Sequence, residues 1–518
     1  GASIFASNIG SEHLIGLAGA GASSGMAMAH WEIQGWMILI LGWVFVPFYT
    51  RSMVYTMPEF LERRYNPQSR TILSVISLVS YVLTKVAVTV YAGGLVFQQV
   101  FGIKELWGID FFWIAAIGLV VLTALYTIFG GMKSVLYTSV LQTPILLLGS
   151  LIILVLGFKE LGGWDEMMRV CGAVTVNDYG DTMTNLIRSN DDANFPWLGA
   201  LIGSAIIGFW YWCTDQFIVQ RVLSGKNEME ARRGTIFGAY LKLLPVFLFL
   251  IPGMIAFALH QKYIGAGGEG FLPMLANGTA NADAAFPTLV AKLLPAGVKG
   301  LVVCGILAAL MSSLASLFNS SAMLFTIDFY KRFRPETPEK KLVGIGQVAT
   351  VVIVILGILW IPIMRSVGDV LYTYLQDVQS VLAPGIAAAF LLGICWKRTS
   401  AQGGMWGLIA GMVIGLTRLG AKVYYSNAGE VADSTFKYLF YDMNWLFFCG
   451  WMFLFCIIVV IVVSLATKAP TAEKIQGLVF GTATKEQKAA TRASWNHWDI
   501  IHTVIILAIT GAFYWYFW

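Results

Sequence analysis

The amino-acid sequence predicts an all-α polytopic membrane protein, and composition is the first reason. Hydrophobic residues make up 57% of the 518 residues, charged residues only 12%, and the mean hydropathy is +0.72. Soluble chains carry about 25% charged residues, so this chain has too few charges to cover a soluble surface. No segment carries the dense basic stripe that nucleic-acid binding requires, which argues against a nucleic-acid partner.

Long apolar stretches are the second reason, because a helix needs roughly 20 apolar residues to cross the hydrocarbon core. The thirteen stretches are 1–22, 26–50, 69–101, 109–129, 134–157, 196–220, 234–258, 300–330, 342–364, 369–396, 401–421, 444–467 and 496–518. The strands of outer-membrane barrels are much shorter, at roughly 10 residues. If residue 1 lies in the cytoplasm, inner loops carry about twice as many Lys and Arg residues as outer loops, as the positive-inside rule requires.

Several ionisable residues lie inside these stretches, where charge is expensive and a functional role is the usual explanation. They are Glu12, Glu32, Lys85, Asp215, Lys242 and Asp377. The same stretches carry the polar residues Asn8, His13, Gln34, Gln216 and Gln376. Any one of them could simply pair with a neighbouring helix, but so many together predict a shared, water-filled cavity.

The first stretch is rich in small and polar residues from Ala6 to His13, which a continuous lipid-facing helix would not tolerate. A helix broken near Gly10 tolerates them, because its freed carbonyl groups can line a cavity. Close helix packing explains the small residues equally well. Packing does not explain Glu12 and His13.

The eighth stretch carries Ser312, Ser313 and Ser316, which recur at helical spacing. Hydroxyl and carbonyl oxygens suit a hard monovalent cation that must leave again. Taken alone, the three serines are explained more simply by hydroxyls that bond back to the preceding turn.

The end of the sixth stretch concentrates the aromatic residues Trp210, Tyr211 and Trp212 just before Asp215. Aromatic rings can stack on the apolar face of a sugar ring, and a tyrosine hydroxyl adds a polar contact. Trp and Tyr are also common at membrane interfaces. The cluster alone therefore leaves both explanations open.

Four motifs carry a resemblance to a known family. They are Tyr126–Ser134 (YTIFGGMKS), Trp210–Gln216 (WYWCTDQ), Tyr240–Leu243 (YLKL) and Met311–Leu314 (MSSL). Through them the chain resembles the sodium:solute symporter family, and in particular a bacterial member of the sodium/glucose cotransporter type. The resemblance covers essentially the whole chain. It implies an inverted repeat of five plus five core helices in 1–157 and 196–396, with broken first and sixth helices, followed by three peripheral helices in 401–518.

The resemblance also implies the site residues. A sodium site is expected at the carbonyl groups of Ala6, Ile9 and Ala309 and the hydroxyls of Ser312 and Ser313. Sugar contacts are expected at Asn8, His13, Glu32, Lys242 and Gln376, with Tyr211 beneath the sugar as the inner gate. The outer gate is expected at Leu17, Trp31 and Tyr372. Gly208 departs from the family pattern, because most members offer a polar side chain there.

A second sodium site, which some members have, is not expected here. It needs an Asp in the fifth span, where this chain has Ser139, and two hydroxyls after Ser312, where it has Ala315 and Ser316. A second cation at that place would meet no formal negative charge, which makes its desolvation costly. The expected ratio is one sodium ion per sugar.

The resemblance thus implies a secondary active transporter that couples inward sodium flow to uptake of a glucose- or galactose-type hexose by alternating access. A multi-pass protein of the bacterial inner membrane is expected, with the sugar, sodium and the lipid bilayer as partners. Two alternatives stay open: a sodium symporter for an inositol, an amino sugar or a monocarboxylate, and a transport-inactive sugar sensor. Glu32 beside Lys242 argues against a carboxylate substrate, and no soluble output domain for a sensor is visible. No nucleophile–base set or metal-ligand spacing predicts an enzyme.

Overall fold

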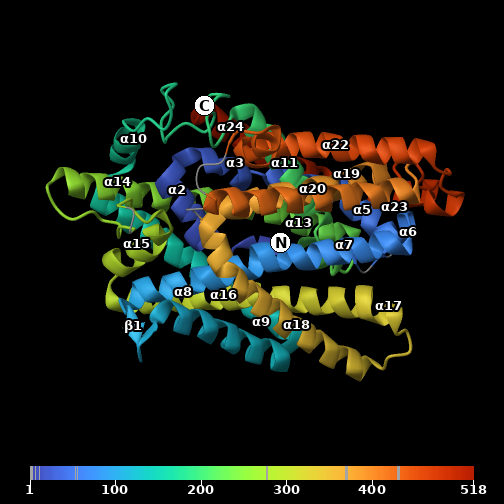
Figure 1. The fold of residues 1–518 in the computed structure, drawn as a ribbon, viewed down its shortest axis with the longest axis horizontal. Coiled ribbons are helices and arrows are strands. Elements are labelled where there is room, and N and C mark those ends of the chain that lie inside the picture. Colours follow the sequence, from blue (N-terminus) through green and yellow to red (C-terminus); the bar gives the residue numbers. More distant parts are fainter. Residues whose placement is uncertain are drawn as a thin grey trace.

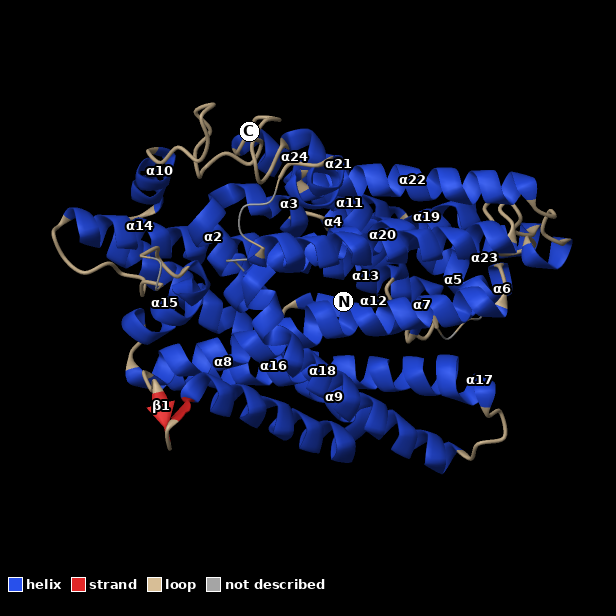
Figure 2. Cartoon of the chain, in the orientation of Figure 1, coloured by secondary structure: helices blue, strands red, loops and turns tan. Residues whose placement is uncertain are grey.

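The computed structural model describes residues 4–5, 8–10, 12–52, 54, 56–275, 278–367, 371–428 and 432–518, with the side chains of all of these except 126, 128–143 and 364–367. Helices dominate this part of the chain (Figure 2). The only sheet within it is a hairpin of two short antiparallel strands, β1 (Glu105–Leu106) and β2 (Ile109–Asp110).

Eleven helices in the described residues are long and apolar enough to cross a membrane. They are Glu12–Ser52, Pro67–Phe101, Pro144–Leu161, Trp197–Thr214, Glu228–Gly265, Ala296–Phe333, Glu339–Ile363, Leu371–Cys395, Ala401–Asn427, Trp445–Ala466 and His497–Tyr516. The first contains residues 12–22 of the first predicted stretch and the whole of the second, and a shorter apolar helix, Phe111–Leu125, lies where the fourth was expected. The prediction of an all-α polytopic membrane protein is therefore confirmed.

Figure 1 shows the elements in chain order. The first half contains α2 (Ala18–Ser24), α3 (Ala29–Glu32), α4 (Gly35–Ile40), α5 (Val46–Ser52), α6 (Met57–Arg64), α7 (Pro67–Ser80), α8 (Ala87–Phe101), α9 (Phe111–Leu161) and α10 (Trp164–Gly172). The second half contains α11 (Trp197–Gly208), α12 (Gln216–Leu223), α13 (Glu228–Lys242), α14 (Ile251–Gly265), α15 (Ala285–Leu293), α16 (Ala296–Met323), α17 (Lys331–Phe333), α18 (Glu339–Val367) and α19 (Leu371–Cys395). The remaining helices are α20 (Ala401–Asn427), α21 (Thr435–Lys437), α22 (Trp445–Ala466), α23 (Lys485–Ala493) and α24 (His497–Tyr516).

Wider turns of π type interrupt or flank many of these helices. They are η1 (Glu12–Leu17), η3 (Leu41–Phe45), η4 (Tyr81–Val86), η5 (Phe209–Thr214), η6 (Val246–Leu250), η8 (Leu324–Tyr330) and η9 (Tyr438–Asp442). Short 3₁₀ turns occupy η2 (Gly25–Met28), η7 (Ala282–Ala284) and η10 (Ala472–Lys474). Single π-type turns inside helices are frequent at functional sites.

The helices pack in two groups that Figure 1 separates. Helices α8, α9, α16 and α18 lie along one side of the view, where α9 and α18 pack on α16. Helices α20 and α22 pack on α19 in the other group. Helix α19 is buried along nearly its whole length, so it lies in the interior of the helix bundle.

Two helices are broken where the predicted fold requires it. The chain bends at Ile9–Gly10, just before the π-type turn η1. The sixth predicted stretch runs from α11 through η5 to Asp215, whose backbone is extended with ψ of 127°. The Asp215 carboxylate accepts a hydrogen bond from the backbone N–H of Phe217 at 3.2 Å and caps α12.

A further break divides the second predicted stretch. Ile33 and Gln34 leave helical geometry between α3 and α4, with ψ angles of 15° and 26°. Trp31 and Glu32 stand at the end of α3, immediately before this break. Helical structure is therefore interrupted in three segments, at Ile9–Gly10, at Ile33–Gln34 and at Asp215, and each break lies close in sequence to polar side chains.

Candidate functional site

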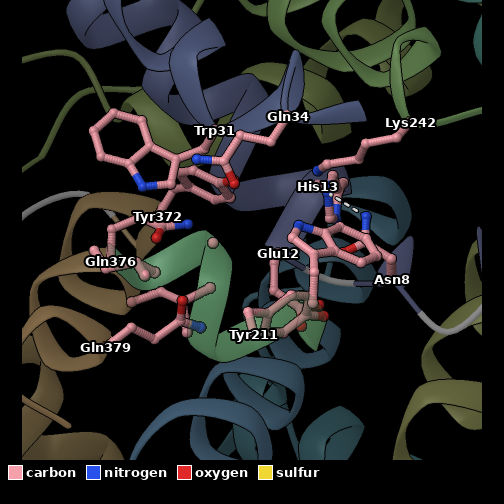
Figure 3. A pocket seen from close by; sticks show the side chains of 14 residues that line it. Asn8, Glu12, His13, Trp31, Gln34, Tyr211, Lys242, Tyr372, Gln376 and Gln379 are labelled. Carbon is pink, nitrogen blue, oxygen red and sulfur yellow. Dashed lines mark hydrogen bonds between the residues drawn. The ribbon is translucent and has the colours of Figure 1, made fainter. Parts of the chain in front are cut away.

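Polar residues from the interrupted helices meet around one small cavity (Figure 3). Its volume is about 40 Å³, which leaves space for only a few water molecules. Its described lining consists of Asn8, Glu12, His13, Trp31, Gln34, Ile207, Gly208, Tyr211, Trp212, Lys242, Tyr372, Leu375, Gln376 and Gln379. The structure thus brings together most of the sugar and gate residues that the resemblance implied.

Glu32 is the centre of a hydrogen-bonded ionic network beside this cavity. Its side chain is fully buried, and its Oε2 lies 2.6 Å from Lys242 Nζ. The Tyr372 hydroxyl donates to Glu32 Oε1 at 2.6 Å, and His13 Nε2 lies 3.3 Å from Oε2. Since a buried charge needs a close partner, these contacts explain how Glu32 and Lys242 are tolerated at this depth.

Some polar atoms around the cavity have no hydrogen-bond partner among the described residues. They are Gln376 Oε1, His13 Nδ1 and Trp31 Nε1, all of them buried. The Asn8 side chain, by contrast, lies 3.3 Å from His13 Nε2 (Figure 3). Buried polar groups are normally bonded, so these atoms of the cavity lining are available to bond a water molecule or a polar ligand.

The two aromatic outer-gate residues and the aliphatic one differ in their positions. Trp31 and Tyr372 line the cavity, and the Trp31 ring stacks on Trp445 with 5.4 Å between centroids. Leu17 is buried at the end of η1 and does not belong to the described lining. Glu32 also lies outside that lining and contacts Lys242 and Tyr372, which belong to it.

Tyr211 lies on the other side of the cavity, on the π-type turn η5. The ammonium group of Lys85 is 4.6 Å from the centroid of its ring and 4.2 Å from that of Phe217. A cation at this distance from a ring face is attracted by the ring quadrupole. Lys85 therefore contacts both Tyr211 and Phe217 of α12 and holds the two rings together.

A second, larger cavity of about 530 Å³ lies along α12, and its lining includes Gln216 and Arg221.

Two of the residues implied for sodium, Ile9 and Ser313, lie at the break in the first helix. A Cβ atom placed on Gly10 would lie 2.8 Å from Ser313 Oγ and 2.5 Å from Glu12 Oε2, so both side chains reach the bend. Ser313 Oγ is buried and has no partner within the described residues. Ala309 and Ser312 are buried on the same helix, and Ile9 forms the bend itself. Ala6, the remaining implied ligand, lies outside the described residues.

Several lining residues had no assigned role in the sequence. Glu12 and Gln34 were noticed only as polar residues in apolar stretches. Gln379 follows Gln376 by three positions, so helical spacing could have placed both on one face. Trp212 belongs to the aromatic cluster that the sequence marks as able to stack on a sugar, whereas Leu375 carries no sequence signal that separates it from ordinary core residues.

Comparison with known proteins agrees with this geometry. The family model described as "Sodium:solute symporter family" matches residues 1–411. The chain is 37% identical to sodium/myo-inositol cotransporter 2 of Homo sapiens over 93% of its own length and 72% of that protein. It is 39% identical to sodium/glucose cotransporter 1 of Ovis aries over 90% of its own length and 72% of that protein.

Among solved structures, the fold is similar to that of a Na⁺-coupled sialic acid symporter in a substrate-bound, outward-open state. The TM-score is 0.67 at 22% identity, covering 91% of this chain and 90% of the other. The likeness supports the inverted five-plus-five arrangement with broken first and sixth helices. The chain therefore belongs to the sodium:solute symporter family, and it is a multi-pass membrane transporter that couples a small solute to sodium rather than an enzyme.

Proposed function

We propose that the protein takes up a hexose of the glucose or galactose type together with sodium. The observation that carries the proposal is the mixed hydrogen-bonding character of the cavity. Glu32 only accepts, Lys242 only donates, and Gln376 does both. Sugar hydroxyls also donate and accept, so a polyhydroxylated ring can satisfy all of these groups at once.

A cyclic polyol such as myo-inositol is the second candidate. It presents the same hydroxyl chemistry, and one of the similar proteins is named for myo-inositol and another for glucose, at nearly equal identity. A monocarboxylate fits less well, because the cation that would bind it, Lys242, already has the Glu32 carboxylate at 2.6 Å.

Sodium is assigned to the carbonyl oxygens of Ala6, Ile9 and Ala309 and the hydroxyls of Ser312 and Ser313. Support comes from the unpaired Ser313 hydroxyl beside the bend at Gly10. Neutral oxygens of this kind hold a hard cation without an excess of fixed charge. The Glu12 carboxylate at the same bend contributes a negative charge close by.

A single sodium ion per solute is proposed. Ser316 Oγ donates to the carbonyl oxygen of Ser312 at 2.8 Å and accepts from Arg221 Nη2 at 2.6 Å. Its hydroxyl thus already donates one hydrogen bond and accepts another, and the Arg221 guanidinium adds positive charge that repels a second cation. The side chain of Ser139, the other residue on which this expectation depends, lies outside the described set.

Alternating access follows from the size of the cavity. About 40 Å³ is far below the roughly 300 Å³ at the lower end of ligand pockets, so the walls must separate before a hexose enters. We assign opening toward the outside to Leu17, Trp31 and Tyr372, and opening toward the cytoplasm to Tyr211. The moving halves are residues 1–157 and 196–396, with 401–518 peripheral, in a bacterial inner membrane.

Uptake into proteoliposomes tests the proposal. Labelled glucose, galactose, myo-inositol and a monocarboxylate are offered with an inward gradient of either sodium or potassium. Sodium should drive hexose uptake and potassium should not. Gln376→Ala should raise the KM for the hexose tenfold or more, because a lost polar contact to a buried partner costs roughly 1.5 kcal/mol or more. Gln402→Ala, at an exposed site on α20, is the matched control.

Three outcomes would contradict the proposal in different ways. Sodium-driven uptake of myo-inositol without hexose uptake would select the second candidate. Sodium-driven uptake of a monocarboxylate alone would exclude a sugar as the transported solute. Sugar-dependent quenching of tryptophan fluorescence without any uptake would identify a sensor.

A further inference from the structure

Gly208 faces the cavity at the end of α11 and offers no side chain to a solute. A Cβ atom at this position would lie 2.5 Å from Gln34 Oε1, 3.0 Å from Gln34 Cδ and 3.2 Å from Gln34 Nε2. The carboxamide of Gln34 therefore fills the space that any side chain at residue 208 would need. The glycine is required by a close approach, since its own backbone is ordinary helix.

Gln34 is held in this place by one hydrogen bond. Its Nε2 donates to the carbonyl oxygen of Ser204 at 2.8 Å, one helical turn before Gly208. The side chain is only 2% exposed, and it belongs to the cavity lining (Figure 3). The structure records no hydrogen bond to its Oε1 from the described residues. The carboxamide is thus fixed by its nitrogen, and its oxygen remains to accept.

We propose that Gln34, whose carboxamide occupies the space that Gly208 leaves open, is a specificity-determining residue, and that its carboxamide oxygen accepts a hydrogen bond from one hydroxyl of a solute in the cavity. The inference rests on the proposed function and makes it more specific. One N–H of Nε2 is bonded to Ser204, which orients the carboxamide so that its oxygen is the acceptor offered to the solute. It selects a solute with a hydroxyl donor there and disfavours one with an ether oxygen or a hydrogen atom.

The pair Gln34 and Gly208 permits a double-mutant cycle. In Gly208→Ala the new methyl group displaces the carboxamide, which is the flexible end of its side chain, so the fold survives while the acceptor moves. Both Gln34→Ala and Gly208→Ala should raise the KM for glucose about 3- to 10-fold, the effect of one neutral hydrogen bond. In the double variant the collision is gone, so its KM should equal that of Gln34→Ala alone.

Monodeoxy analogues of glucose identify the hydroxyl concerned. In the wild-type protein, removal of that hydroxyl should raise KM by the same factor as Gln34→Ala. In Gln34→Ala the same analogue should bind as well as glucose, because the partner is already missing. The sodium concentration for half-activation should stay unchanged in all variants, which separates recognition of the solute from damage to the cation site.

Gly420→Ala is the matched glycine control, since nothing lies within 4 Å of a Cβ atom there, and it should transport as the wild type does. Additive effects of Gln34→Ala and Gly208→Ala, or equal penalties for every deoxy analogue in wild type and Gln34→Ala, would overturn the inference while the proposed function stands. A wild-type protein without sodium-driven uptake of any hydroxylated solute would overturn both.

Discussion

The ionic network of Glu32 beside the solute cavity and the cation site both draw on the broken first helix, yet their polar groups are paired in opposite ways. In the network, Glu32 is bonded to Lys242 and Tyr372 at 2.6 Å each. At the cation site, the Ser313 hydroxyl is buried with no partner in the described residues. Glu12 reaches both the cavity and the cation site.

This difference has an energetic consequence. A solute must exchange hydrogen bonds with a network that is already complete around Glu32, so selectivity depends on how well its hydroxyls replace existing bonds. A cation instead meets an oxygen that no described protein group uses. Stability should therefore depend strongly on the cavity residues and weakly on the cation ligands, whereas transport depends on both.

The largest effect is expected at Glu32. Glu32→Gln leaves the Lys242 ammonium buried without its counter-charge, which should lower the free energy of unfolding by about 3–5 kcal/mol and abolish transport. Replacing both partners, with Glu32→Gln and Lys242→Met, should restore most of the stability and none of the transport. Thermal unfolding in detergent and uptake in proteoliposomes measure the two properties separately.

Glu336→Gln, at an exposed site, controls for loss of a carboxylate in general. If the Glu32 single variant is as stable as the wild type, the network is not what holds the cavity walls together. The contrast between the two sites would then disappear.

The next effect is expected at Ser313. Ser313→Ala should raise the sodium concentration for half-activation tenfold or more, because a contact to a charged ligand is worth roughly 1.5–3 kcal/mol. Stability should not fall, since the hydroxyl has no described partner to lose. Ser321→Ala removes another buried hydroxyl recorded without a partner on the same helix, and sodium activation should not change. Unaltered sodium activation in Ser313→Ala would exclude this site.

A third region tests the rule that buried carboxylates need a cation. Asp283, in the turn η7, is buried and accepts hydrogen bonds from the backbone N–H of Leu371 at 3.2 Å. No cation pairs with it among the described side chains. Burial raises the pKa of Asp283 from 3.8 to about 7, and the Leu371 hydrogen bond offsets only part of this.

The sign of the pH effect follows from that pKa. The folded protein holds the Asp283 proton more tightly than the unfolded chain, so its stabilisation is full below about pH 4 and is lost as pH rises through about 7. Asp283→Asn should remove this dependence and be more stable than the wild type at pH 8, by the order of a few kcal/mol, and equal near pH 4. Unfolding midpoints from pH 4 to pH 8 measure it, with exposed Asp178→Asn as the control. Parallel pH profiles would contradict it.

The transmembrane architecture could be predicted because the bilayer imposes it locally. Each crossing needs an apolar stretch of fixed length, and the small and polar residues around Gly10 mark where the first helix cannot continue, whereas the break in the sixth helix was expected from the family resemblance alone. The break at Ile33–Gln34 was not predicted. The stretch 26–50 is apolar over most of its length, and such a stretch predicts a single continuous helix. The π-type turns were not predicted either, since no residue pattern specifies them.

The pairings inside the site depend on tertiary structure. Glu32 is separated from Lys242 by 210 positions and from Tyr372 by 340, so their bonds follow from packing and from no local pattern. Gly208 was recognised as a missing polar side chain, but only the three-dimensional arrangement places Gln34 in that space. The role of Gln34 could not be read from a residue that looked merely polar.

The smallest effect is expected in the stoichiometry of the cation site. The wild type should move one sodium ion per solute, and Ser316→Ala should leave that ratio unchanged, although it removes a hydrogen bond from Arg221. One ion at about 100 mV supplies about 2.3 kcal/mol from the membrane potential, in addition to the sodium gradient. Reversal potentials in proteoliposomes, measured at several solute gradients, give the ratio directly.

A ratio near two would mean that oxygens other than Ser316 hold a second cation despite the nearby guanidinium. The charges of the cation region would then be balanced by protein groups, as they are in the Glu32 network. A ratio near one in both proteins would mean that the charge of Arg221 excludes the second cation. The double change Arg221→Gln and Ser139→Asp should then admit a second ion.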